Sequence, residues 1–290
     1  MPDLPHPKLR ADGWIIDPYG FDRKRFRRYL MKYLVTGKPV INCITASPDP
    51  GAPFGITSQE QVDVCREFNV PMFFYCVDPK WGSPAVWLHS DDPAIAKCRE
   101  WLLKVVDEAH RTDTTQLPLS TANYSTGQPI EVAGDENNHF VYLDDFSTLQ
   151  FVDDATIRGF LNLRWDGIAE SLSVEPRDQR VNSVQLIYHF QSEFEMYDMQ
   201  AELSGELVST SGVKTSLALS LNGWRWEDEQ SIEIPKVTRR TARRLRKQPF
   251  TLISSFRNRA GYRSNEFWVR VQVELPQAYK RRVTKRKGLS

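Results

Sequence analysis

The feature that most constrains the fold is the stretch 38–79, in which two short apolar segments flank a loop and a helix. Residues Val40–Thr45 are apolar and β-branched, which is typical of a buried strand. After a loop rich in Pro and Gly, Thr57 and Glu60 stand at the spacing of a capping box, which predicts the start of a helix. Met72–Val77 is a second apolar segment. The order strand, helix, strand predicts a parallel pair joined by a crossover helix.

The same alternation extends over residues 1–111, which we predict to form an α/β domain. Residues 21–35 place apolar side chains at helical spacing, with Arg and Lys on the other side, and this predicts an amphipathic helix with a basic face. A further strand is expected at 85–89 and a helix at 93–110. The basic face of the first helix is either simply solvated or in contact with phosphates.

A change of period marks the second part of the chain. Residues 112–138 are polar and contain many Ser, Thr, Gly and Pro residues, so we predict a linker or long loop. Residues 139–276 contain alternating apolar and polar runs, imperfectly at 156–165 and clearly at 183–190. Several short strands separated by Ser-Gly and Asn-Gly turns predict a mostly antiparallel β domain, sandwich or barrel-like.

Several classes of protein are disfavoured by the sequence. No run of roughly 18 apolar residues and no apolar N-terminal segment is present, so we expect a cytoplasmic protein with no membrane partner. The four cysteines form no C-x-x-C pair and match no zinc spacing. Because they lie among apolar residues, we interpret them as reduced core residues, with a nucleophilic role for Cys43 as the alternative.

No catalytic motif of high specificity is present, so the sequence leaves enzymatic activity open. The loop 46–55 before the helix could cradle an anion, but its glycine spacing matches no phosphate-binding motif. Adjacent acids occur more often in caps or in solvent than on a metal, and the pairs are Asp91/Asp92, Asp144/Asp145 and Asp153/Asp154. Because no ligand spacing is matched, no metal site is predicted.

The net charge of +1 hides a strong segregation along the chain. Residues 236–290 carry 17 Lys and Arg against 2 Asp and Glu, whereas residues 131–235 carry 6 against 20. The positive charge is concentrated in a basic insertion at 236–248 and a basic tail at 277–290, and a segment that keeps like charges close together is suited to bind anions. The candidate nucleic-acid-binding residues are Arg239, Arg240, Arg243, Arg244, Arg246, Lys247, Lys280, Arg281, Arg282, Lys285, Arg286 and Lys287.

The order of an apolar strand, a helix that begins with PFGITSQEQ and the strand VPMFFYCVD resembles part of the nuclease core of restriction-endonuclease-like PD-(D/E)XK proteins of defence systems. The resemblance covers residues 39–89. In that family the first of these strands carries a Glu-x-Lys that serves metal-dependent hydrolysis. Here the strand reads VINCIT, with neither acid nor Lys and with Asn42 inside it.

The resemblance therefore implies a degenerate core or metal ligands elsewhere. In the second case the candidate catalytic acids are Asp17, Asp49 and Glu60, and the cofactor would be Mg²⁺. A generic Rossmann-like or flavodoxin-like layer fits the same pattern, with ligands expected at the carboxyl ends of its strands.

The charge pattern favours a nucleic-acid-associated protein that binds the phosphate backbone of DNA or RNA through its basic C-terminal third, in a defence or mobile-element context. Phe256, Tyr262 and Trp268 lie near arginines and could stack on bases, but they fit a β core better. A second interpretation is an assembly protein, a homo-oligomer in which the acidic β domain pairs with the basic segment of another copy. A third is a divergent metal-dependent nuclease.

Overall fold

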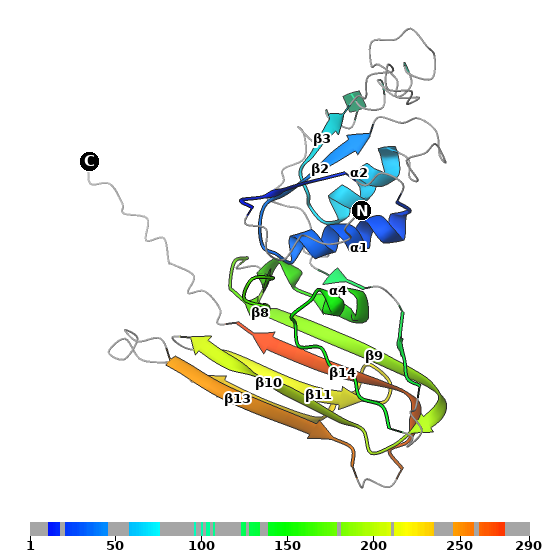
Figure 1. Ribbon diagram of the computed structural model, residues 1–290, viewed down its shortest axis with the longest axis vertical. Coiled ribbons are helices and arrows are strands. Elements are labelled where there is room, and N and C mark those ends of the chain that lie inside the picture. Colours follow the sequence, from blue (N-terminus) through cyan, green and yellow to red (C-terminus); the bar gives the residue numbers. More distant parts are fainter. Residues whose placement is uncertain are drawn as a thin grey trace, which may run out of the picture.

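The structure is a computed structural model, and it describes residues 11–17, 21–45, 58–75, 123–125, 128–133, 139–178, 181–209, 212–234, 246–257 and 261–275, together with five helical positions between 96 and 107. It contains an α/β layer formed by N-terminal residues and a larger β region (Figure 1). The expected strand at 85–89 lies outside the described residues, as does most of the expected helix at 93–110. Within the described parts, no helix is long and apolar enough to cross a membrane.

The N-terminal layer is a three-stranded parallel sheet, as the sequence predicts. Its strands are β1 (Trp14–Ile16), β2 (Val40–Thr45) and β3 (Met72–Tyr75), in that order across the sheet. Alternation along β2 buries Val40, Asn42 and Ile44, and leaves Ile41 38% exposed. The polar residue Asn42 therefore lies on the side of the sheet that is packed inside the protein.

Two helices cover this inner side. α1 (Arg23–Leu34) lies between the sheet and the β region, and α2 (Ser58–Glu67) precedes β3 (Figure 1). The carboxylate of Asp22 caps α1 by accepting a hydrogen bond of 2.7 Å from the backbone N–H of Arg25. After the helix, Gly37 takes a φ of 68°, a left-handed conformation that glycine adopts without steric cost. The predicted amphipathic helix is therefore confirmed, with its apolar face buried against the core.

The β region is built around two long antiparallel strands, β9 (Ser183–Met196) and β14 (Ser264–Glu274). The sheet runs in the order β12-β11-β14-β9-β6-β4, and the short β5 pairs in parallel with β9. Its remaining strands are β4 (Asn123–Tyr124), β5 (Ile130–Glu131), β6 (Ala155–Arg158), β11 (Val213–Ser220) and β12 (Glu227–Ile234). The predicted alternation at 183–190 is confirmed, since every second side chain there is buried.

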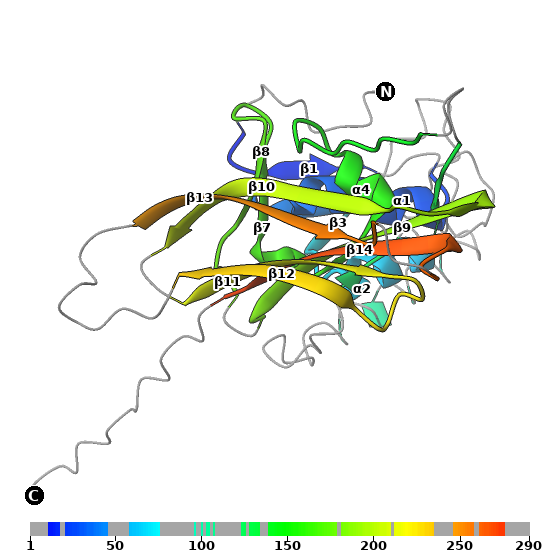
Figure 2. The same ribbon diagram turned by 90° about the horizontal axis from the view of Figure 1, so that it is seen from below.

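Two further pairs of strands complete the region. β10 (Gln200–Ser209) and β13 (Arg246–Ser255) form an antiparallel ribbon that packs against β11 and β12 as a second layer (Figure 2). β7 (Leu163–Asp166) pairs with β8 (Ser171–Val174). Among the described strands, β12 and β4 are the two ends of the main sheet and do not pair with each other, so this sheet is open.

Three details differ from the sequence prediction. The segment 112–138, predicted to be a linker or long loop, contains β4 and β5, which are too short and polar to show a period of their own. The run 156–165, whose alternation is imperfect, forms two strands divided by the 3₁₀ turn η4 (Phe160–Asn162), because Gly159 takes a φ of 75°. The last residues of the predicted insertion 236–248 belong to the ribbon, since β13 begins at Arg246.

One hydrophobic core runs through both regions. α4 (Gln150–Asp154) lies against α1 and buries Phe151 completely. The rings of Phe68, after α2, and Phe160, in the β region, have their centroids 6.0 Å apart. The backbone N–H of Trp165 donates a hydrogen bond of 2.6 Å to the carbonyl of Val35. The two regions are therefore packed together by shared apolar contacts as well as connected by the chain.

Candidate functional site

Several strand ends meet at one end of the β region. In the strand registers, Ser209 lies opposite Arg246, Val213 opposite Ile234, and Lys214 opposite Glu274. Ser209 and Val213 are close in sequence, so the last residue of β12, the first of β13 and the last of β14 belong to the same end. We call this the basic end, defined by Ile234, Arg246 and Leu275. The chain enters the basic insertion after Ile234 and the basic tail after Leu275.

Two of the twelve predicted nucleic-acid-binding residues lie on the described backbone. Arg246 and Lys247 open β13, opposite Ser209 and Val208. The other ten lie outside the described residues, namely Arg239, Arg240, Arg243, Arg244, Lys280, Arg281, Arg282, Lys285, Arg286 and Lys287. The registers therefore bring the attachment points of both basic clusters together, which the spacing of charges in the sequence could not reveal.

The described charges near the basic end largely compensate one another. Lys214 lies between Glu233 and Glu274 across the sheet, and its Nζ is 3.3 Å from Oε1 of Glu229. The second carboxylate oxygen of Glu229 is 3.0 Å from Nη2 of Arg270. The described strand ends therefore supply no large surplus of charge of their own.

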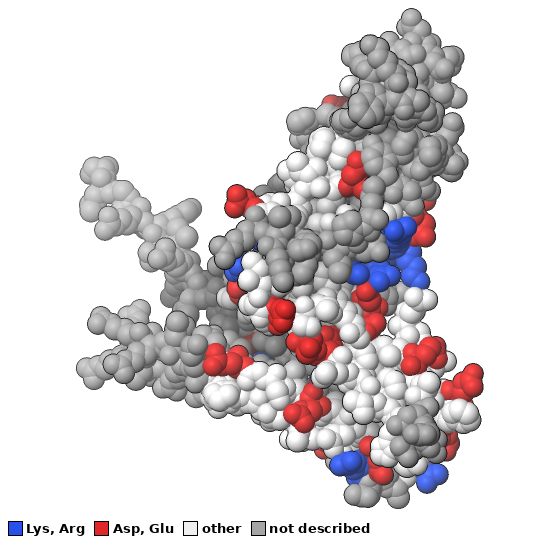
Figure 3. Space-filling model, viewed as in Figure 1, with Lys and Arg blue, Asp and Glu red and all other residues white. Residues whose placement is uncertain are grey.

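Carboxylates from distant parts of the chain form ion pairs with most of the basic side chains along the basic face of α1. Glu67, the last residue of α2, accepts hydrogen bonds of 3.0 and 2.6 Å from Nε and Nη2 of Arg27, and lies 3.6 Å from Arg23. Asp153 on α4 forms a two-pronged ion pair with Arg28 and accepts a bond of 3.0 Å from Lys32. Figure 3 shows the basic side chains of α1 gathered beside acidic ones. This face is therefore more a structural junction than a free basic surface.

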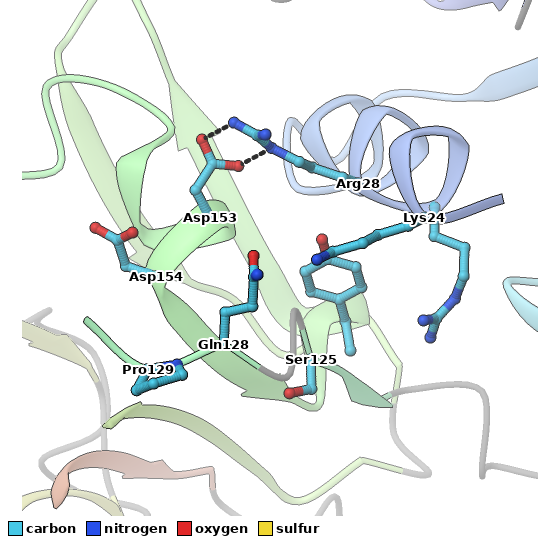
Figure 4. Close-up of a pocket in the computed structure, with 9 residues that line it drawn as sticks. Lys24, Arg28, Ser125, Gln128, Pro129, Asp153 and Asp154 are labelled. Atoms are coloured by element: carbon cyan, nitrogen blue, oxygen red, sulfur yellow. Dashed lines mark hydrogen bonds and ion pairs between the residues drawn. The ribbon is translucent and has the colours of Figure 1, made fainter. Parts of the chain in front are cut away.

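A pocket of about 250 Å³ opens at this junction. Lys24, Arg27 and Arg28 of α1 line one side, and the end of α4 with the segments around β4 and β5 lines the other. In Figure 4 the Lys24 side chain extends from α1 toward the side of the pocket that Gln128 lines. The sequence pattern identified the basic helix face, but it could not show that residues 120 positions later close a pocket over it.

The aromatic residues near arginines pack against other side chains of the β region. Phe256 is 1% exposed and packs with Tyr262, whose hydroxyl donates a hydrogen bond of 2.6 Å to Glu227. The Trp268 ring stacks on His189 with centroids 4.3 Å apart. These rings therefore serve the β region's own packing, which agrees with the interpretation as core residues.

The candidate catalytic acids are not brought together into an evident metal site. Asp17 follows β1, and burial raises the pKa of its carboxyl to about 6. Its Oδ1 is buried and has no hydrogen-bond partner among the described residues. Glu60 lies in the first turn of α2, and Asp49 lies outside the described residues. Within the described parts of the chain, no group of three or more His, Cys, Asp or Glu side chains could hold a metal ion.

The inner side of the parallel sheet holds polar side chains that sequence reasoning only partly anticipated. Asn42 is fully buried, and neither end of its amide has a hydrogen-bond partner among the described residues. Gln61 on α2 is 1% exposed, and its Oε1 is also unpaired within that part of the chain. In the sequence Asn42 stands out because it interrupts an apolar strand, but Gln61 carries no signal of this kind.

Cys43 and Cys65 are buried free thiols, as expected for core cysteines. Burial raises the pKa of the Cys43 thiol to about 11, and the nearby carboxylate of Asp17 adds to this shift. Burial also raises the pKa of the Cys65 thiol to about 12. Because the thiolate is the nucleophile, these values disfavour the nucleophilic alternative for Cys43. Cys76 and Cys98 lie outside the described residues.

The acidic residues of the described pairs accept hydrogen bonds from other residues of the fold. Asp144 accepts a hydrogen bond of 2.9 Å from the hydroxyl of Tyr188, and Asp145 accepts one of 2.9 Å from the N–H of Ser147. Asp154 accepts a bond of 2.8 Å from the hydroxyl of Tyr142. The pair Asp91/Asp92 lies outside the described residues.

Comparisons with family models, with curated proteins and with solved structures found no match for this chain. The resemblance to restriction-endonuclease-like cores therefore stays a prediction, and the function has to be argued from the sites themselves.

Proposed function

We propose that the protein binds DNA or RNA by its sugar–phosphate backbone, through the two basic segments attached at the basic end. The observation that supports this is the strand register, which joins Ile234, Arg246 and Leu275 at one end of the β region. Residues 236–247 and 280–287 carry 13 Lys and Arg and no Asp or Glu. Two such segments from neighbouring attachment points can act on one polyanion at the same time, because their effective concentration is high.

The mechanism of binding is electrostatic. Lys and Arg that neutralise phosphates release condensed counterions, so the affinity falls with a log–log slope of about −0.9 per phosphate on duplex DNA. A contact with six or more phosphates would weaken by roughly 10³-fold between about 50 and 200 mM salt. Phosphate contacts carry no direct sequence information, so little base preference is expected.

The test is fluorescence anisotropy with a labelled duplex and a labelled single strand at several salt concentrations. Replacing the six basic tail residues at 280–287 by Gln should weaken binding and flatten the salt slope, and replacing Arg239, Arg240, Arg243 and Arg244 should do the same. The matched control is the double variant Arg23→Gln with Arg25→Gln, which removes the same kind of charge from α1. Binding that does not depend on salt, or an equal loss in the control, contradicts the proposal.

A second candidate is self-assembly, with the basic segments of one copy on the acidic surface of another. The observation in its favour is a set of exposed acids on β9 and β10, namely Glu193, Glu195, Glu202 and Glu206. Sedimentation of nuclease-treated protein separates the two candidates. Particles that dissociate as salt rises, with no nucleic acid present, favour assembly. A monomer at all salt concentrations leaves nucleic-acid binding.

The nuclease alternative and the defence context have no described residue group in their favour. They would be supported by Mg²⁺-dependent cleavage that is lost in Asp17→Ala or Glu60→Ala. We also propose that the ribbon and the main sheet form a sandwich-like domain that serves as a rigid platform for the basic segments. The supporting observation is the packing of β13 on β11 and β12.

A further inference from the structure

We propose that the pocket between α1 and α4 binds a small phosphomonoester, with Lys24 as the cation that holds the phosphate. The proposal concerns a site separate from the basic segments and does not depend on the proposed function. It depends on how the charges around the pocket are shared, on the donors that line it and on its size.

Among the described cations that line the pocket, one takes part in no ion pair. Glu67 takes the guanidinium groups of Arg23 and Arg27, and Asp153 takes Arg28 and Lys32. Lys24 lines the same pocket and makes no ion pair or hydrogen bond with any residue that the structure describes. The ammonium group of Lys24 is therefore available for an anion that is not part of the chain.

The carboxylate of Asp154, which also lines the pocket, does not face α1. Asp154 accepts a hydrogen bond of 2.8 Å from the hydroxyl of Tyr142, and in Figure 4 its carboxylate points away from α1. Counting Glu67, Asp153 and Asp154 against the five cations of α1 around them leaves a surplus of two positive charges. A surplus of this size matches the charge of a phosphomonoester near neutral pH, about −1.5 to −2.

Neutral hydrogen-bonding groups complete the lining. The amide of Gln128 and the hydroxyl of Ser125 come from the segments around β4 and β5, on the side opposite α1. Both residues already interact within the fold, and the Ser125 hydroxyl shares a hydrogen bond of 2.8 Å with the hydroxyl of Thr156. Amide and hydroxyl groups can donate to phosphate oxygens and can also bond to the hydroxyls of an attached sugar or polyol. A Lys ammonium among such donors is a common arrangement for holding phosphate.

The size and shape of the pocket limit the organic part of the ligand. Ligand pockets usually measure about 300–1,000 Å³, and the volume of this pocket, about 250 Å³, is below that range. Tyr124 is only 3% exposed, with the guanidinium of Arg27 6.0 Å from the centre of its ring, so it offers no open face on which a base could stack. The ligand class is therefore a sugar phosphate or polyol phosphate rather than a complete nucleotide.

The experiment is isothermal titration of the full chain with ribose 5-phosphate, inorganic phosphate and ribose. Ribose 5-phosphate is expected to bind with one site per chain, inorganic phosphate more weakly, and ribose not at all. The affinity should rise between pH 5 and pH 7.5, as the phosphate loses its second proton with a pKa of about 6. No binding of ribose 5-phosphate at millimolar concentration, or tighter binding of inorganic phosphate, overturns the proposal.

Two variants of α1 test the role of Lys24. Lys24→Gln should weaken ribose 5-phosphate binding at least tenfold, whereas Arg25→Gln, which removes the same charge one residue later but does not line the pocket, should change it less than twofold. Equal losses in the two variants would mean that only the overall field of the helix matters, and would overturn the assignment.

Two further titrations identify the source of the phosphate and test whether this site is independent of the basic end. A dinucleotide with a 5′-phosphate that binds more tightly than ribose 5-phosphate would identify the end of a nucleic acid as the source, and equal or weaker binding would identify a free small molecule. The variant with all six tail cations replaced by Gln should keep its ribose 5-phosphate affinity even if it loses polyanion binding. Loss of both together overturns the independence of the two sites.

Discussion

Two fully buried asparagines, one in the β region and one in the N-terminal layer, have different hydrogen-bond environments. The amide nitrogen of Asn162, in η4, donates to the carbonyls of Asp178 and Val181 at 3.2 and 2.9 Å. Its oxygen accepts from the N–H groups of Arg177 and Asp178 at 2.9 and 2.7 Å. Asn42, on β2, is equally buried, and its amide has no such partner among the described residues, with only the Cys65 thiol beside it.

This difference has an energetic meaning. A buried polar group without a partner costs about 1–3 kcal/mol, whereas a group that is fully hydrogen-bonded stabilises the fold and fixes its local geometry. Asn162 therefore organises the turn between β6 and β7. In the N-terminal layer, by contrast, Asn42, Gln61 and Asp17 have buried polar atoms with no hydrogen-bond partner among the described residues. Four substitutions test whether this difference in hydrogen bonding affects the stability of the protein.

The largest effect is expected for Asn162→Leu. The substitution removes four hydrogen bonds and leaves the backbone groups of residues 177, 178 and 181 without their partner. We expect a loss of about 4 kcal/mol in the free energy of unfolding, because several buried groups become unsatisfied together. Urea denaturation followed by tryptophan fluorescence measures this change. A loss below about 1 kcal/mol would mean that the four bonds do not organise the turn, and the contrast with Asn42 would disappear.

The second effect concerns the ion pairs that join the two regions. In Asp153→Asn the Lys32 ammonium, on a side chain only 7% exposed, loses its carboxylate, and we expect a cost of about 3 kcal/mol. The matched control is Glu67→Gln, whose partners Arg23 and Arg27 are 48% and 29% exposed, and there we expect a cost of about 1 kcal/mol or less. Equal costs in the same denaturation assay would show that the burial of Lys32 is not what makes this junction important.

The third substitution is Asn42→Leu, which is expected to act in the opposite direction from Asn162→Leu. Replacing an unsatisfied amide by an apolar side chain of similar size should stabilise the protein by about 1 kcal/mol. The same denaturation assay measures it. A loss of stability would show that Asn42 has a partner beyond the described residues, and Asn42 would then resemble Asn162.

The predictability of these features follows from the range of the contacts that create them. The period-two pattern of 183–190 and the capping acid Asp22 are local signals, and the strand β9 and the helix α1 follow from them. The strands β4 and β5 have no local signal and exist because the edge of the sheet at β6 and β9 accepts them. Local pattern therefore predicted the elements with their own period and missed those that depend on a partner.

The same reasoning applies to the candidate sites. The basic face of α1 was visible in the sequence, but Asp153, which neutralises Arg28 and Lys32, lies more than 120 positions away. The pocket that includes Lys24 depends on this long-range closure and could not be predicted from the helix alone. The meeting of the two basic clusters at one end likewise depends on strand register, which pairs residue 209 with residue 246. Charge content is local information, but its neutralisation and convergence are properties of the fold.

The smallest effect is expected for Asp17→Asn, and it should depend on pH. Burial raises the pKa of the Asp17 carboxyl in the folded protein to about 6, from 3.8 in the unfolded chain. The folded state therefore holds this proton more tightly, and its contribution to stability is present at low pH and is lost as pH rises through about 6. The asparagine variant cannot ionise, so it should be more stable than the native protein at pH 7.5, by about 1 kcal/mol or less because the carboxyl is partly solvated.

The difference between the Asp17→Asn variant and the native protein should vanish near about pH 2.5, because the carboxyl of the native protein is largely protonated in both the folded and the unfolded state only well below 3.8. Chemical denaturation of the two proteins at about pH 2.5, 6 and 7.5 measures it, with Asp22→Asn as the control for a solvent-exposed acid at a helix cap. If Asp17→Asn is instead less stable at pH 7.5, the ionised carboxylate has a partner that stabilises it. Asp17 would then not be an unpaired buried group, and it would again be a candidate for an acid that binds a ligand.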